Sequence, residues 1–103
     1  MTMQEILPIG SVVLLKKALK KIVVIGLFPT QTTHAGEKVT YDYMGLPYPE
    51  GYMGENTVLF FDKDQIQEIV FRGYDDDERK FMLGAMKKIL DSAERVVEEK
   101  VNE

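Results

Sequence analysis

Short runs of β-branched and other apolar residues, separated by Gly, Pro and polar turns, occupy the chain up to Tyr74. Runs of this length and composition are typical of β-strands. They predict five strands, at Ser11–Lys16, Lys21–Phe28, Val39–Met44, Thr57–Phe61 and Ile66–Tyr74. Gly26 inside the second run indicates a bulge or a close backbone approach. The polar stretch Thr30–Lys38 is expected to be a loop.

The hydrophobic period changes after Tyr74, where apolar residues begin to recur every three or four positions. Asp75 is a favourable N-cap and Glu78 has the capping-box spacing, so the pattern predicts an amphipathic helix over residues 75–101. Opposite charges at i,i+4 spacing follow its polar face. Its apolar face consists of Met82, Ala85, Met86, Ile89, Ala93, Val96 and Val97.

Strands followed by one helix indicate an α+β fold. We expect a small bent antiparallel sheet or half-barrel of about five strands, followed by one long C-terminal helix whose apolar face the sheet buries. The 103 residues suffice for a single domain, with a β-rich part at residues 6–74. Asp62 is expected to cap a single helical turn before the last strand.

Charge and residue usage exclude several classes of function. The net charge of −4 argues against a nucleic-acid partner. No cysteine is present, which excludes disulfides and thiolate chemistry. The N-terminal segment MTMQEILPIG does not resemble a secretory signal, and the apolar run Ile22–Phe28 is too short to span a membrane. We therefore expect a cytoplasmic protein without a membrane partner.

Catalytic constellations are missing from the sequence. Neither a phosphate-binding glycine loop nor a G-x-S-x-G motif occurs. His34 is the only histidine and has no apparent partner ligands, so we interpret it as a solvated loop residue. The acidic run Asp75–Glu78 lacks the spacing of a calcium loop and fits helix capping better. We predict no catalytic, cofactor-binding or metal-binding residues, and a protein that is not an enzyme.

The segment Tyr41–Gly54, YDYMGLPYPEGYMG, is the strongest candidate for a binding site. It is too rich in Pro and Gly for a helix and too aromatic for a solvated linker. Large amphipathic side chains on a turn-rich backbone suit a partner site, or a loop folded onto its own core. The predicted partner anchors are Tyr43, Tyr48, Tyr52 and Met53.

Two further surfaces are candidates. Four lysines crowd the turn of the first predicted hairpin: Lys16, Lys17, Lys20 and Lys21. They would suit a phosphate or an acidic partner, or would simply keep a solvated hairpin from pairing at its edge. The helix end at Val97–Glu103 would extend past the sheet, and a homodimer or partner contact through the helix would form there.

Several of these segments together resemble one family. The pattern LPIGSVV … YDY.G..YPEG..G … I..V.F.GY, over roughly residues 6–80, resembles the domain of unknown function 4176, a family of small proteins found mostly in Firmicutes. The lysine-rich turn KKALKK departs from the shorter, Gly-containing turn expected in this family.

The resemblance implies an accessory role. Family members are often encoded beside type VII secretion components and LXG-type polymorphic toxins. This neighbourhood implies a cytoplasmic adaptor or chaperone for an exported toxin. One alternative is an immunity protein that neutralises a toxin domain, and another is a small-ligand-binding domain or enzyme. No catalytic residues come with the family.

Overall fold

The computed structural model describes the backbone of residues 6–102 and the side chains of residues 6–89. The chain divides into two units, which are described separately: a sheet unit at Leu7–Tyr74, and a helix unit that contains Asp75 onward together with the N-terminal segment ending at Ile6.

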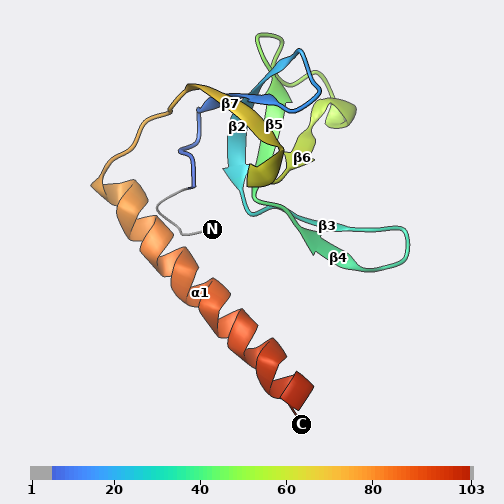
Figure 1. Ribbon diagram of the computed structural model, residues 1–103, viewed down its shortest axis with the longest axis vertical. Coiled ribbons are helices and arrows are strands. Elements are labelled where there is room, and N and C mark those ends of the chain that lie inside the picture. The colour runs from blue at the N-terminus through green and yellow to red at the C-terminus, as the bar shows by residue number, and fades with distance from the viewer. Residues whose placement is uncertain (1–5, 103) are drawn as a thin grey trace. The chain divides into compact units, whose positions relative to one another are not determined.

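The sheet unit contains a five-stranded antiparallel sheet, in the order β6-β5-β2-β1-β7, and a separate two-stranded ribbon (Figure 1). Together with the C-terminal helix, this sheet confirms the predicted α+β class. The strands are β1 (Val12–Leu15), β2 (Lys21–Leu27), β3 (Thr30–Thr32), β4 (Lys38–Thr40), β5 (Tyr43–Pro47), β6 (Leu59–Phe61) and β7 (Ile66–Phe71).

Alternate residues of the central strands are buried on one face of the sheet. Val13 lies opposite Ile22 in the β1–β2 hairpin, and Tyr43 lies opposite Phe61 between β5 and β6. Residues directly opposite in an antiparallel pair project to the same face, so these pairs meet in the core. The buried apolar side chains of the unit are Leu7, Val13, Ile22, Val24, Tyr43 and Phe61.

The predicted third strand, Val39–Met44, is wrong as a single element. The chain leaves the strand conformation at Tyr41 and Asp42, and resumes in β5, which extends through Pro47. The polar stretch predicted as a loop instead forms a ribbon of β3 and β4, because its β-branched residues pair across the hairpin. The Thr30 and Thr40 hydroxyls lie 3.0 Å apart there.

Two turn predictions are confirmed. The β2–β5 register shifts between Val24 and Gly26, which is the expected bulge. A 3₁₀ turn, η3 (Lys63–Gln65), precedes β7, and Asp62 forms a capping box with Gln65. A second 3₁₀ turn, η2 (Glu55–Thr57), precedes β6.

The turn Leu7–Ser11 ties β2 to the end of β7. Gly10 donates its N–H to Val24 at 2.8 Å, and Val24 donates to the Ser11 carbonyl at 2.8 Å. The buried Ser11 hydroxyl accepts the N–H of Gly73 at 2.9 Å. A Cβ on Gly73 would lie 2.9 Å from the Ser11 nitrogen, so only glycine permits this approach.

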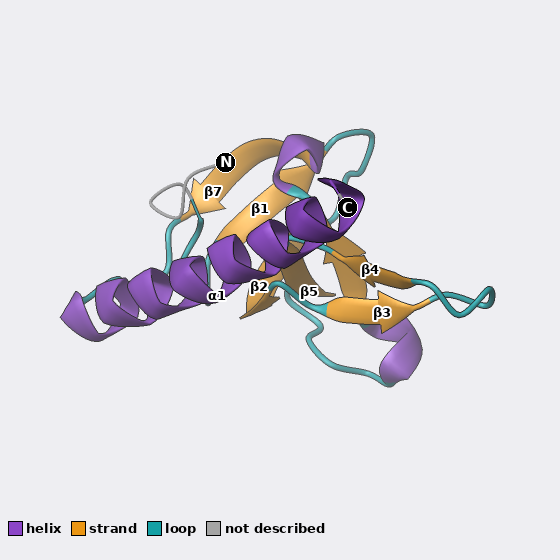
Figure 2. Ribbon diagram, turned by 90° about the horizontal axis from the view of Figure 1, so that it is seen from below, coloured by secondary structure: helices purple, strands orange, loops and turns teal. Residues whose placement is uncertain are grey.

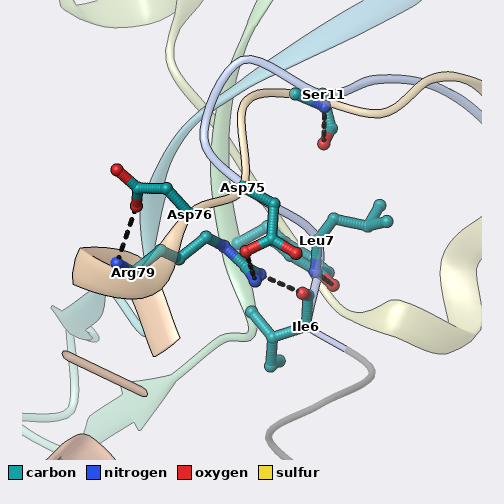
Figure 3. A network of polar contacts seen from close by, with 8 residues as sticks. Ile6, Leu7, Ser11, Asp75, Asp76 and Arg79 are labelled. Atoms are coloured by element: carbon teal, nitrogen blue, oxygen red, sulfur yellow. Dashed lines mark hydrogen bonds and ion pairs between the residues drawn. The ribbon is translucent and has the colours of Figure 1, made fainter. Parts of the chain in front are cut away.

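The helix α1 spans Asp77–Asn102 and begins two residues later than predicted. Asp76, rather than Asp75, accepts the N–H of Arg79, at 2.9 Å. Arg79 also pairs with Asp75 at 3.2 Å and donates to the carbonyl of Ile6 (Figure 3). The predicted capping box of Asp75 and Glu78 is therefore wrong, because Asp75 serves the Arg79 guanidinium instead.

The predicted apolar face of α1 is only partly buried. Met82 is 39% exposed and Ile89 is 69% exposed, whereas Leu83, beside the predicted face, is 6% exposed. Three predictions reach residues outside the described side chains: the apolar positions Ala93, Val96 and Val97, the i,i+4 ion pairs Lys87–Asp91, Asp91–Arg95 and Arg95–Glu99, and the dimer contact at Val97–Glu103.

Candidate partner-binding surface

The lysine-rich hairpin and the Pro/Gly segment, two separate candidates in the sequence, lie at the same end of the sheet. The first half of β2 pairs with the last half of β5, with Val23 opposite Leu46. The turn before β2 and the loop after β5 therefore emerge side by side (Figure 1). The N–H of Tyr48 donates to the carbonyl of Lys21 at 2.9 Å and continues this pairing into the loop.

An ion pair joins the two loops. Lys20 Nζ lies 2.5 Å from Glu50 Oε1, and both side chains are nearly half exposed. The hydrogen bond from Lys20 lowers the pKa of the Glu50 carboxyl from its ordinary value. Among the described side chains, Lys20 is the only one of the four clustered lysines in an ion pair. Lys16, Lys17 and Lys21 are exposed around it.

Large apolar side chains stand beside these charges. Leu19 at the hairpin turn is 101% exposed, Met53 is 69% exposed, Tyr52 is 62% exposed and Tyr48 is 47% exposed. We call the exposed residues of the two loops the tip surface. It consists of Lys16, Lys17, Leu19, Lys21, Tyr48, Tyr52 and Met53, with the Lys20–Glu50 pair.

One backbone hydrogen bond and two bonds to the Thr57 hydroxyl hold the Tyr52 and Met53 segment in place. Gly51 donates its N–H to the carbonyl of Pro47 at 2.8 Å, which closes a turn. Thr57 accepts the N–H of Met53 at 3.2 Å and donates its hydroxyl to Gly54 at 2.6 Å. A loop with its backbone tied at both ends presents its side chains with less entropy to lose on binding.

Comparison with known proteins gives one family. The family model of the domain of unknown function DUF4176 matches residues 6–82. The chain belongs to this family. No curated protein and no solved structure matches it.

The position of Tyr43 in this DUF4176 domain corrects our prediction of a partner anchor. Tyr43 is fully buried at 0% exposure and stacks on Phe61 with ring centroids 5.3 Å apart. Its hydroxyl accepts the buried N–H of Leu7 at 3.0 Å. As the first residue of β5 it projects to the core face, so the predicted anchors reduce to Tyr48, Tyr52 and Met53.

Asp42, in the middle of the YDY motif, also has a structural role. Its carboxylate accepts the N–H of Lys63 at 2.8 Å, while its own N–H donates to Asp62 at 3.0 Å. These reciprocal bonds fasten the start of β5 to the turn after β6. Asp42 and Tyr43 of the YDY motif and Gly73 of the GY motif thus make internal contacts of this DUF4176 domain.

The remaining chemical candidates are not part of the tip surface. His34 is exposed in the loop between β3 and β4, and Asp75 and Asp76 are engaged at the start of the helix. Within the residues that the structure describes, no three His, Asp or Glu side chains are grouped as a metal site. No helix in that part of the chain is both long enough and apolar enough to cross a membrane.

A second exposed apolar surface was missed from the sequence. Ile69, Val70 and Phe71 of β7 are 41%, 45% and 61% exposed, and Tyr74 beyond them is 73% exposed. The signal was available in the sequence. Three consecutive apolar residues in a strand place side chains on both faces, so a sheet with one core face cannot bury all three.

Proposed function

We propose that this DUF4176 domain is a non-catalytic binding module, a cytoplasmic adaptor or chaperone that holds an LXG-type toxin of the type VII secretion pathway. The tip surface is the proposed contact. The observation that supports it is the joining of two separate sequence candidates, through Lys20–Glu50 and Tyr48–Lys21, into one end of the sheet.

The chemistry of the tip surface fits a protein partner. Tyr side chains and Met are enriched at the centres of interfaces, where large contact areas become desolvated. Fully burying an exposed side chain of this size contributes about 1.5–3 kcal/mol. The surrounding lysines favour partners with a complementary negative charge and increase the rate of encounter. A client segment that combines apolar and acidic side chains matches both properties.

Co-purification with the LXG toxin encoded beside the gene tests this proposal. The double variant Tyr48→Ala/Tyr52→Ala should reduce toxin capture by at least about 30-fold, since even one central interface residue contributes about 2 kcal/mol or more. Tyr74→Ala is the matched control, because Tyr74 is a tyrosine outside both loops that is more exposed than either Tyr48 or Tyr52. Unchanged capture by the double variant, with the same melting temperature as wild type, would reject the tip surface.

A second candidate function rests on the net charge of −4. An acidic protein can cover the basic cleft of a toxin nuclease domain, as an immunity protein does. The two roles differ in a cell that already contains active toxin. An immunity protein restores growth of that cell, whereas a chaperone changes the level or export of the toxin without protecting the cell.

A further inference from the structure

The strand β7 forms one edge of the five-stranded sheet. Within residues 6–102, its only strand neighbour in the sheet is β1 (Figure 2). Five of its six residues are exposed, and these include Ile69, Val70 and Phe71. An edge strand with unpaired backbone groups and apolar side chains is a template for another strand.

One charged residue on β7 and one directly after its last residue bracket its apolar run. Glu68 and Arg72 are both exposed, and among the described side chains neither has a charged partner. They lie two residues before and two residues after Val70. The run Glu68–Arg72 is therefore complementary to itself when read in the opposite direction.

We propose that β7 pairs with β7 of a second copy of this chain, antiparallel, with the two-fold axis at Val70. In this register Glu68 lies opposite Arg72 of the partner subunit, and Ile69 lies opposite Phe71 of the partner subunit. Val70 lies opposite its own copy. Opposite charges and paired apolar side chains at facing positions both stabilise an antiparallel pair.

Other registers lose this complementarity. An axis at Ile69 places Glu68 opposite Val70 of the partner subunit, and an axis at Phe71 places Arg72 opposite Val70 of the partner subunit. A parallel pair in register brings like charges together. An axis between Val70 and Phe71 pairs Arg72 with Ile69 of the partner subunit, so only the axis at Val70 matches charge with charge.

The irregular pairing of β7 with β1 limits how far strand addition at this edge can extend. Val70 and Gln67 have no Cα partner on β1, because the register shifts at both places. Such bulges increase the local twist of an edge and limit continued strand addition. A two-fold pair of β7 strands is also isologous, so it closes after one partner and forms a dimer rather than a fibre.

Cysteine cross-linking tests the axis directly, because the chain contains no cysteine. Facing residues of an antiparallel pair have Cα atoms about 4.5–5.5 Å apart, within the range that a disulfide spans. Val70→Cys should therefore give a disulfide-linked dimer under mild oxidation. Leu59→Cys is the matched control, since Leu59 lies on the opposite edge strand and is 38% exposed.

Charge exchange tests the register by sedimentation of the full chain over a range of concentrations. Glu68→Arg alone and Arg72→Glu alone should each weaken dimerisation about tenfold, since two symmetry-related pairs become like-charge contacts. The combined variant restores opposite charges and should recover the wild-type dissociation constant.

Three results would overturn the proposal. The first is a wild-type chain that is monomeric at every concentration up to the millimolar range. The second is cross-linking of Val70→Cys that is no faster than cross-linking of Leu59→Cys. This result counts against the proposal even when the introduced thiol resists alkylation because its own chain covers it. The third is a combined charge variant that dimerises as weakly as the single variants.

Discussion

Replacing Gly45 with alanine should destabilise the sheet unit through a steric clash that the structure locates. Gly45 is buried in the middle of β5. A Cβ at this position would lie 2.5 Å from Ile22 Cγ2, 2.9 Å from the carbonyl oxygen of Val23 and 3.1 Å from Phe61 Cε1. The Val23 carbonyl is backbone within a paired strand, so it cannot give way as a flexible side chain does.

The expected loss follows from these three contacts. Adding a methyl group to a well-packed core destabilises by about 1–3 kcal/mol, and a clash with backbone places Gly45→Ala at about 3 kcal/mol. The melting temperature should fall by about 12–24 °C, since each kcal/mol shifts it by about 4–8 °C in a domain of this size. Urea unfolding followed by circular dichroism measures the free energy of unfolding directly.

Two further variants separate the clash from a general effect of losing a glycine. A Cβ on Gly84 meets nothing within 4 Å, so Gly84→Ala should stabilise the helix by up to about 1 kcal/mol. Ile22→Ala creates space beside Gly45, so the double variant should be less destabilised than the sum of the two single changes. A Gly45→Ala protein within about 0.5 kcal/mol of wild type, the usual range for surface changes, would refute the described packing of β5 on β2.

Three other predictions follow from individual contacts. Asp76→Ala should destabilise the helix by about 1 kcal/mol, as an N-cap does, whereas Asp75→Ala should have a smaller effect on thermal unfolding; equal losses would contradict the assignment of the cap. Lys20 lowers the pKa of the Glu50 carboxyl. Their ion pair should therefore still be present when the pH equals the ordinary pKa of glutamate, and it should be lost as the pH falls through the lowered pKa. Lys20→Met should raise the midpoint of the Glu50 carboxyl resonance in a pH titration by NMR, and an unchanged midpoint would exclude Lys20 as the cause. Tyr43→Phe removes the hydroxyl that accepts the buried N–H of Leu7. It should lower the free energy of unfolding in urea by about 1–3 kcal/mol, and a neutral result would show that the hydroxyl is dispensable.

Local pattern was sufficient for the elements whose pairing partners are close in sequence. The β1–β2 hairpin follows from two β-branched runs around a lysine turn, and η3 follows from the cap at Asp62. The start of the helix was misplaced because adjacent aspartates are equivalent as caps. Only the contact of Arg79 with Ile6 and Asp75 distinguishes them.

The candidate site was predicted in pieces. Aromatic content identified Tyr48, Tyr52 and Met53, but composition does not tell which tyrosine of a segment points inward. Tyr43 is buried because β5 begins at that residue. The strand conformation is interrupted at Tyr41 and Asp42, and the alternating sequence pattern does not reveal this interruption. The meeting of the lysine turn with the loop after β5 depends on the pairing of β2 with β5, which joins segments about twenty residues apart.

The position of β7 beside β1 has a consequence for the order in which the domain folds. Val12 pairs with Phe71, so the first strand of the sheet waits for the last one. At about 5–20 residues per second, a ribosome needs about 3–12 s to synthesise the segment between them. During that interval the nascent chain can form the β1–β2 hairpin but has an open strand edge at β1. Completion of the sheet is therefore a late, long-range event, and this small domain should fold more slowly than its length alone suggests.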